Sequence, residues 1–311
     1  MSGATAVGEG THVSGIQFGV YLPQLRMDVP TILERVRTAE AAGFSSAWLM
    51  DHLMAPMLPE ADTYEAWTLI SALAAGTERI RLGHLVGCDP FRHPALLAKM
   101  AVTVDAISGG RLELGLGWGS VEDELRRLGF GPAPADERAA RLGETLEVLE
   151  LLLTGEPVTF TGEHVRLEEV VCRPTPVTGR IPVHLGGAGE RLTMPLVRRY
   201  ADWWNCPAYG LDRLEDLCAQ AGDARVSVQH PIGFVADGAD REEVATTAER
   251  RFGGWGGLLV GDAAELAERL AAEAELGVEL FILQFSDFGH PATLEAFGRE
   301  VLPRLHVGDH A

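Results

Sequence analysis

The sequence predicts an α/β protein whose fold is a TIM (β/α)8 barrel. Short apolar runs alternate along the chain with segments whose apolar residues are spaced by three and four, the pattern of strands followed by amphipathic helices. Several runs are almost continuously apolar, as parallel strands covered by helices are. There are eight runs in 311 residues, a length usual for one barrel of this kind. We therefore favour a closed barrel over an open doubly wound sheet.

The eight expected strands have the short length and apolar composition of buried strands. They span residues 15–22, 46–50, 79–86, 111–117, 181–187, 201–206, 225–236 and 279–285. Helical spacing between them is clearest in four groups of apolar residues: Ile32, Val36 and Ala39; Leu97, Met100, Val104 and Ile107; Leu146, Leu149 and Leu153; and Leu266, Leu270 and Ala274. Residues 39–50 (AEAAGFSSAWLM) resemble residues 272–283 (AEAELGVELFIL), because in each a helix ends at a glycine, Gly43 or Gly277, before a buried strand.

The predicted organisation is one barrel domain over residues 15–303. Residues 1–14 have neither the basic start nor the apolar core of a signal peptide, and we expect a disordered N-terminal leader there. Residues 304–311 are expected to form a C-terminal tail. The segment 154–180 is rich in Thr, Pro and Gly and interrupts the strand–helix rhythm, so it predicts a small hairpin inserted before the fifth strand.

Composition excludes several classes of function. A formal charge of −19 repels phosphate backbones and anionic membranes, and no run approaches the roughly 18 apolar residues of a membrane span, so we expect neither nucleic-acid nor membrane partners. Lys99 is the only lysine, and no Gly-Lys-Ser/Thr sequence exists, so the chain has no phosphate-loop motif. Schiff-base chemistry would have to use Lys99, which we expect at the surface. The four cysteines are scattered without metal-ligand spacing, which predicts free thiols, no metal and a cytoplasmic location.

Gly115, Gly117 and Gly119 occupy alternate positions at the end of the fourth expected strand. A dinucleotide-binding fingerprint would need a glycine at position 120, which is Ser120, and a second strand ending in an acid about 20 residues further on. The chain there, residues 136–153, has helical spacing instead. If the glycines face the barrel interior, they leave space for a flat ligand to approach the backbone; the alternative is that they only relieve crowding between strands.

In a TIM barrel the chemistry gathers at the carboxyl ends of the strands. Asp51 and His52 directly follow the second expected strand, where an acid and an imidazole can orient a ligand and pass a proton. Cys88, Arg92 and His93 follow the third strand.

The segment GGAGER after the fifth strand leads into a helical pattern. Gly186, Gly187 and Gly189 would present free backbone N–H groups at a helix start, and Arg191 adds a positive charge. We interpret this loop as an anion site.

Several of these segments together resemble the bacterial luciferase-like superfamily. They are DH (51–52), GHLVGCDPFRHPALLAKMAVTVDAISGGRLELGLGWG (83–119), PVHLGGAGE (182–190), YADWWN (200–205) and LVGDAAELAERLAAEAELGVELFIL (259–283). The resemblance covers about residues 15–303 and is most specific over residues 92–119. Within the superfamily the chain is most similar to the branch that uses the deazaflavin coenzyme F420, mainly through Asp51 and His52.

The resemblance implies a deazaflavin lying over the strand ends. Its ring would rest on a non-proline cis peptide bond between Leu85 and Val86, with His52 beside it as proton donor or acceptor and Asp51 orienting the ring or the imidazole. The residues implied in cofactor binding are Leu85, Val86, Gly117, Gly186, Gly187, Ala188, Gly189 and Arg191.

The function that follows is hydride transfer between coenzyme F420 and a small organic substrate. An FMN-dependent monooxygenase of the same fold is one alternative, and a catalytically silent cofactor-binding barrel is another. The sugar-phosphate dehydrogenases of this branch carry a catalytic Glu where this chain has Ser120, and they bind sugar phosphate with lysines, of which only Lys99 exists here. A sugar-phosphate substrate is therefore not expected. The role of Ser120 and the formation of a homodimer stay open.

Overall fold

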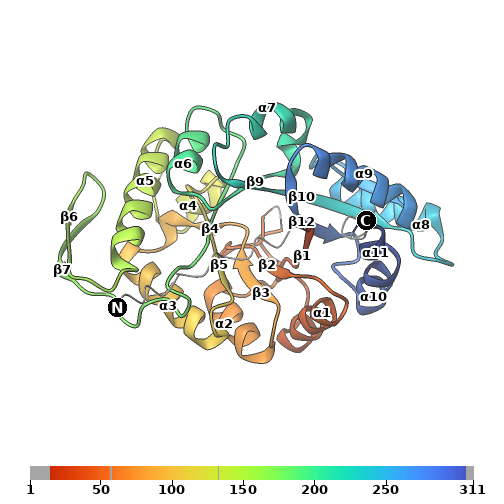
Figure 1. The fold of residues 1–311 in the computed structure, drawn as a ribbon, viewed down its shortest axis with the longest axis horizontal. Coiled ribbons are helices and arrows are strands. Elements are labelled where there is room, and N and C mark those ends of the chain that lie inside the picture. The colour runs from red at the N-terminus through yellow and green to blue at the C-terminus, as the bar shows by residue number, and fades with distance from the viewer. Residues whose placement is uncertain (1–14, 57, 132, 306–311) are drawn as a thin grey trace, which may run out of the picture.

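The computed structural model describes residues 15–56, 58–131 and 133–305 (Figure 1). The expected leader, residues 1–14, and residues 306–311 of the expected tail lie outside this part of the chain. The helix α11 (Leu302–Leu305) continues past residue 303, so the domain boundary expected there falls inside a helix. Leu302, the first residue of this helix, is 5% exposed and belongs to the hydrophobic core.

Eight parallel strands close into a barrel, which confirms the predicted fold. They are β1 (Gln17–Tyr21), β2 (Ser46–Leu49), β3 (Arg81–His84), β5 (Leu112–Gly117), β8 (Val183–Gly186), β9 (Trp203–Cys206), β10 (Arg225–Phe234) and β12 (Val278–Phe285). They pair in this order around the barrel, and β12 pairs with β1 to close it. Two short strands extend the sheet: β4 (Gly87–Cys88) pairs with β5, and β11 (Leu259–Gly261) pairs with the end of β10.

Helices surround the barrel (Figure 1). Besides α11 they are α1 (Val29–Ala41), α2 (Ala66–Gly76), α3 (Pro94–Ser108), α4 (Glu122–Arg127), α5 (Ala135–Leu152), α6 (Thr193–Tyr200), α7 (Leu214–Cys218), α8 (Arg241–Phe252), α9 (Ala263–Glu275) and α10 (Pro291–Glu300), with 3-10 turns η1 (Asp89–Phe91) and η2 (Ala208–Arg213). Asp28, Glu65, Asp240 and Asp262 cap helix starts by accepting first-turn N–H groups. Gly43 and Gly277 follow helix ends with φ of +96° and +99°, as predicted.

The inner face of α3 differs from the prediction at one residue. Ile107 is 44% exposed, whereas Ser108 is buried. The buried face of the helix runs through Leu97, Ala101 and Val104 to Ser108, which places residue 107 outside it.

The insertion before the fifth barrel strand is a hairpin, as predicted. Strands β6 (Val158–Thr161) and β7 (Arg166–Val170) pair antiparallel and lie beside α5 at the edge of the molecule (Figure 1). The carboxylate of Glu144 on α5 accepts the N–H groups of residues 163–165 at 2.7–2.9 Å, which fixes the hairpin turn to the barrel.

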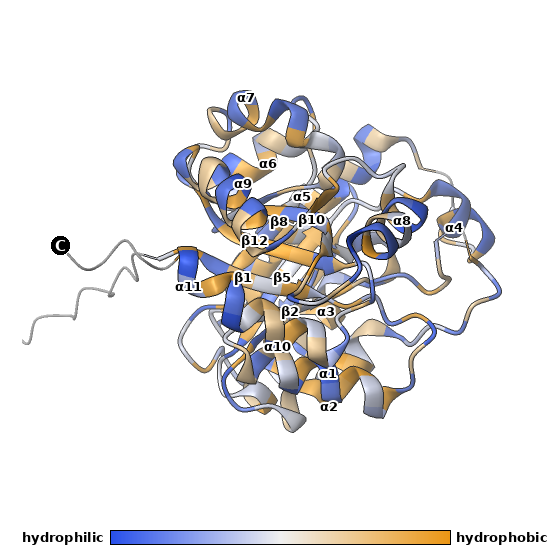
Figure 2. Ribbon diagram, turned by 90° about the vertical axis from the view of Figure 1, so that its right-hand side faces the viewer, coloured by the Kyte–Doolittle hydropathy of each residue, from blue (hydrophilic) through white to orange (hydrophobic). Residues whose placement is uncertain are grey.

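Apolar side chains fill the layer between the strands and the helices, and the polar helix faces point outward (Figure 2). Toward the amino ends of the strands, the barrel interior holds a polar group instead. Glu113 accepts from His184 Nε2 at 2.7 Å and pairs with Arg81, and the His184 ring stacks on Trp203. Burial alone would raise the pKa of Glu113, but the contacts with His184 and Arg81 hold it below its ordinary value. This buried pair belongs to the barrel core and lies away from the carboxyl ends.

Candidate active site

A cavity of about 430 Å³ opens at the carboxyl ends of the barrel strands. Every residue expected in the site lines it except Arg191, which is exposed and lies outside the lining. These residues belong to four segments that are separate in sequence, and the barrel brings the segments to one place.

The peptide bond between Leu85 and Val86 is cis, which the resemblance implied. The Val86 side chain lies against glycines of two neighbouring strands: a Cβ at Gly117 would be 2.7 Å from Val86 Cγ2, and one at Gly186 would be 3.0 Å from Cγ1. A Cβ at Gly115 would be 1.8 Å from the carbonyl oxygen of His84. These glycines are therefore required by the close approach of residues 84–86.

This arrangement decides between the two interpretations of the strand-end glycines. Gly115 makes room for the neighbouring chain and does not line the cavity, so the expectation that it leaves space for a ligand is wrong. Gly117 and Gly119 do line the cavity. The ligand-facing backbone thus begins at the last residue of β5.

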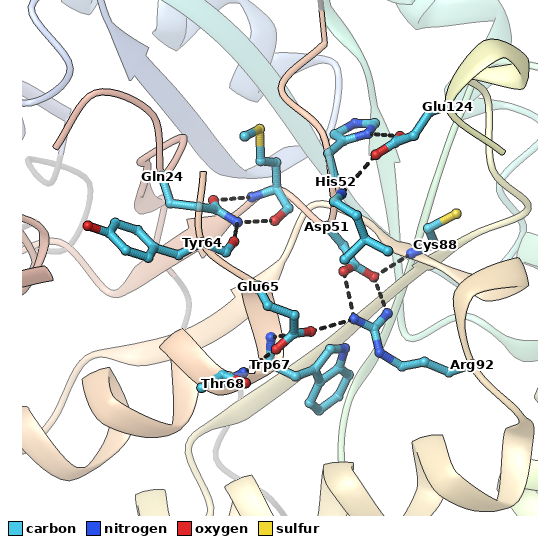
Figure 3. Close-up of polar contacts among 12 residues, drawn as sticks. Gln24, Asp51, His52, Tyr64, Glu65, Trp67, Thr68, Cys88, Arg92 and Glu124 are labelled. Atoms are coloured by element: carbon cyan, nitrogen blue, oxygen red, sulfur yellow. Dashed lines mark hydrogen bonds and ion pairs between the residues drawn. The ribbon is translucent and has the colours of Figure 1, made fainter. Parts of the chain in front are cut away.

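The Asp51 carboxylate is buried at the end of β2 and is fully engaged (Figure 3). It accepts two hydrogen bonds from Arg92, at 2.5 and 2.9 Å, and a third from the N–H of Cys88 at 2.8 Å. Arg92 also pairs with Glu65 at 2.7 Å. Burial by itself would lower the pKa of Arg92, but the two carboxylates raise it above its ordinary value. Asp51 therefore fastens the segment after β3 to the end of β2.

His52 is oriented by Glu124, a residue that the sequence interpretation missed. The imidazole Nδ1 lies 2.6 Å from Glu124 Oε2 (Figure 3). Glu124 Oε1 accepts the N–H groups of Leu53 and Met54 at 2.8 and 3.0 Å. The expectation that Asp51 orients this imidazole is wrong, because both Asp51 oxygens are taken by Arg92 and Cys88.

The environment of Glu124 keeps it ionised. Burial would raise its pKa, but hydrogen bonds from His52 and from the Leu53 and Met54 N–H groups lower it below the ordinary value. An ionised carboxylate accepts a proton-bearing Nδ1, so Nε2 of His52 is the nitrogen left to act on a ligand in the cavity.

The sequence contained a weak indication of Glu124. Acids crowd the first turn of α4, where they are commonly surface residues that favour the helix start. Glu122 and Asp123 are exposed, but Glu124 is 5% exposed. Together with Val121 and Leu125, which are apolar and line the cavity, it occupies the inner face at helical spacing.

The loop between β8 and α6 presents backbone N–H groups, with one difference from the prediction. The N–H of Gly187 donates to the carbonyl of Asn205 at 3.2 Å, so it is not free. The N–H of Ala188 donates to the hydroxyl of Tyr209. Within the described part of the chain, the N–H groups of Gly189 and residues 190–192 have no protein acceptor. The orphan donors thus lie just after the expected pair of glycines, immediately before the helix α6.

Arg213 supplies the positive charge on this wall. It comes from η2, lines the cavity and donates to the Ala188 carbonyl at 3.2 Å, while pairing with Glu190 at 2.7 Å. Arg191 was expected in this place. Because η2 follows a different strand, β9, sequence proximity to the loop could not reveal Arg213.

Cys88 and His93, the two other candidates at the strand ends, have no catalytic role in this arrangement. The thiol of Cys88 lines the cavity, and burial raises its pKa, so it is a neutral thiol and not a nucleophile. His93 is exposed and caps α3 by accepting the N–H of Ala95. Lys99 is exposed on α3, as expected.

Two further kinds of feature are absent from residues 15–56, 58–131 and 133–305. No group of His, Cys, Asp and Glu side chains there has the arrangement of a metal site. No helix in the same residues has the length and apolar character needed to cross a bilayer.

Fold and cavity together define a barrel enzyme of the luciferase-like type. The model of the family described as luciferase-like monooxygenase matches residues 11–225, and the chain belongs to this family. A sequence relative, the F420-dependent glucose-6-phosphate dehydrogenase of Microbacterium testaceum, is 28% identical over 309 residues, which cover 86% of this chain and 90% of the relative.

Two solved structures share the fold at low sequence identity. An F420-dependent secondary alcohol dehydrogenase in complex with an F420-acetone adduct has a TM-score of 0.75 and 20% identity, covering 94% of this chain and 99% of its own. The oxygenating constituent of 3,6-diketocamphane monooxygenase from Pseudomonas putida, in complex with FMN, has a TM-score of 0.73 and 19% identity, covering 94% and 99%. The fold is therefore shared with a deazaflavin enzyme and with a flavin enzyme.

Proposed function

We propose that this protein transfers a hydride between coenzyme F420 and a small organic substrate, with His52 as the proton-transfer group. The observation that carries the proposal is the His52–Glu124 pair, which lies in the cavity wall with Nε2 left for a ligand. A proton must leave or join a hydroxyl or carbonyl oxygen when a hydride moves at the adjacent carbon, and a positioned imidazole supplies or takes it.

Features of the chain fit a flat ring joined to a phosphate-bearing tail. Gly117 and Gly186 bring backbone to the cavity beside Val86, where a side chain would occupy the space. The orphan N–H groups of Gly189 and residues 190–192 suit a phosphate, with Arg213 nearby on the Ala188 carbonyl. Leu85, Val86, Gly117 and the 186–189 loop would hold the cofactor.

When bound, F420 supplies a ring carbon that takes up or gives a hydride and reacts poorly with oxygen. The protein supplies the rest. His52 Nε2 accepts the hydroxyl proton of an alcohol, or returns a proton to the oxygen of a carbonyl in the reverse direction. Glu124 holds the imidazole in the tautomer with the proton on Nδ1. Asp51, paired with Arg92, is a positioning residue that fixes the segment on which the ring would rest.

The alternative is an FMN-dependent monooxygenase, which the likeness in fold to an FMN-bound oxygenating enzyme supports. The sequence relative of Microbacterium testaceum covers most of this chain and is named for F420, which favours the deazaflavin. Both cofactors carry a phosphate, so the loop at 186–189 suits either. F420 and FMN are distinguished by the chemistry of their rings, hydride transfer for F420 and oxygen activation for FMN.

Titrating the purified protein with F420 and with FMN tests the proposal. We expect F420 to bind, FMN to bind at least tenfold more weakly, and F420 to change its redox state in the presence of a substrate without oxygen uptake. Tight FMN binding with substrate-dependent oxygen consumption would establish the monooxygenase. Binding of either cofactor without turnover of any substrate would indicate the silent barrel.

A further inference from the structure

We infer that the substrate is a neutral, largely apolar molecule with one hydroxyl or carbonyl group, and not an anion or an amine. This inference rests on the proposed function and names the substrate class of the same site. It is drawn from the charges and apolar side chains of the cavity wall.

The two carboxylates in the described lining of the cavity, Asp51 and Glu124, accept hydrogen bonds from other protein groups. Both oxygens of Asp51 accept from Arg92, and one also accepts from the Cys88 N–H. Both oxygens of Glu124 are occupied, by His52 and by the N–H groups of Leu53 and Met54. An ammonium group would find no free carboxylate oxygen here, and a buried cation without such a partner is strongly disfavoured.

The positive groups are equally committed. Arg92 is paired with two carboxylates, and Arg213, at the opposite loop, is paired with Glu190. Lys99, the only lysine, donates to the carbonyl of Arg173 outside the cavity lining. No cation in the described lining is therefore free beside His52 to receive a carboxylate or phosphate of a substrate, and the formal charge of −19 adds repulsion.

Apolar side chains cover the wall next to His52. On α4, Val121 and Leu125 line the cavity on either side of Glu124. Across the opening, Pro207 and Tyr209 line it, and Tyr209 is 69% exposed. An exposed aromatic at a cavity mouth is a contact surface for apolar groups of a ligand.

Ser120 offers a position at which the charge of the wall can be changed. It lines the cavity at the end of the β5 segment, is exposed, and its hydroxyl has no partner in the described part of the chain. A substitution there breaks no hydrogen bond. A lysine at this position would supply the cation that the wall lacks.

The test measures dissociation constants of two probes of equal chain length, 2-heptanone and heptanoate, for the protein–F420 complex by calorimetric titration. We expect 2-heptanone to bind at least tenfold more tightly than heptanoate. Across the ketones from 2-pentanone to 2-nonanone, affinity should rise about three- to fourfold per methylene group. In Ser120→Lys, heptanoate should bind at least tenfold more tightly than in the original protein, whereas Ser120→Gln should leave the ratio of the two probes within a few fold.

Three results overturn the inference: heptanoate binding as tightly as 2-heptanone in the unchanged protein, ketone affinity independent of chain length, or no ketone binding to the F420 complex. If F420 itself does not bind to the protein, so that no protein–F420 complex forms, the proposed function is contradicted. Preference for heptanoate with F420 bound would leave the cofactor assignment intact and reject only the substrate class.

Discussion

At the scale of single residues, the carboxylate of Glu124 is shared between two demands that only an acid can meet. One oxygen accepts from His52 and the other from the N–H groups of Leu53 and Met54. In a glutamine the oxygen can accept from the loop N–H groups, but the NH2 group then donates to Nδ1 and favours the tautomer with the proton on Nε2. Glu124→Gln should therefore disturb the tautomer of His52, and we expect kcat to fall about 10- to 1000-fold.

The matched control is Asp123→Asn on the same helix. Asp123 is exposed and pairs only with Arg126 and Arg127 at the surface, so its replacement should leave kcat within a factor of two. F420 affinity should stay within a few fold in both variants, because neither carboxylate belongs to the loop at 186–189. A Glu124→Gln enzyme with unchanged kcat would reject the role of this acid.

The same pair predicts a pH dependence of stability. The pKa of Glu124 is lowered in the folded protein from an ordinary value of 4.5, so its contribution to the free energy of unfolding is fully present above about pH 4.5. The contribution is lost as the pH falls through the lower, folded-state pKa. Chemical unfolding at several pH values should show Glu124→Gln less stable than the original protein near neutrality, with the difference shrinking in acid.

The sequence located those site residues that directly follow a barrel strand. Asp51 and His52 were found because they follow a strand directly, and both line the cavity. Their pairings were not predicted, although Arg92 was expected at the same strand ends. Arg92 lies 41 residues from Asp51 in sequence, and Glu124, which was missed, lies 72 residues from His52. Hydrogen bonds between such distant residues depend on how the loops fold back, which local periodicity does not determine.

At the scale of elements, the loop between β8 and α6 can be tested without disturbing its backbone. Gly187 is unsuitable because its φ of +133° favours glycine. Gly189 has no such φ, and a Cβ there would lie 3.2 Å from Thr193 Oγ1. We expect Gly189→Val to cover the orphan N–H groups and weaken cofactor affinity at least tenfold, measured by titration.

Gly254→Val serves as the control, since a Cβ at Gly254 would meet nothing within 4 Å. It should leave affinity unchanged, and thermal unfolding should show both variants folded. Because F420 and FMN both carry a phosphate, this result is independent of which of them binds. Unchanged affinity in Gly189→Val would place the phosphate elsewhere.

All eight barrel strands were predicted from their apolar runs, and their ends were less well predicted. The third was expected over residues 79–86, but β3 ends at His84 and the chain resumes pairing with β5 only at β4, after Leu85 and Val86. The two residues between β3 and β4, Leu85 and Val86, are also apolar, and both line the cavity. The apolar pattern of a sequence cannot distinguish a strand from an irregular segment that is also apolar, such as the half-buried Leu85 and Val86.

At the scale of the whole molecule, the closed barrel explains why sequence alone located the site. Closure brings the ends of β2, β3, β5, β8 and β9 around one cavity, so residues assigned separately to strand ends converge. What closure does not specify is which side chains of the connecting segments reach inward. Arg213 and Tyr209 after β9 line the cavity, whereas Arg191 after β8 does not.

The account depends most on His52 as the proton-transfer group of an F420-dependent reaction. Its most direct test is the single-turnover rate of F420 oxidation or reduction, at saturating cofactor and substrate, in the original protein and in His52→Ala. We predict a rate lower by about 100- to 10,000-fold in the variant, with F420 affinity within a few fold. A His52→Ala protein that turns over F420 at the original rate would contradict the account.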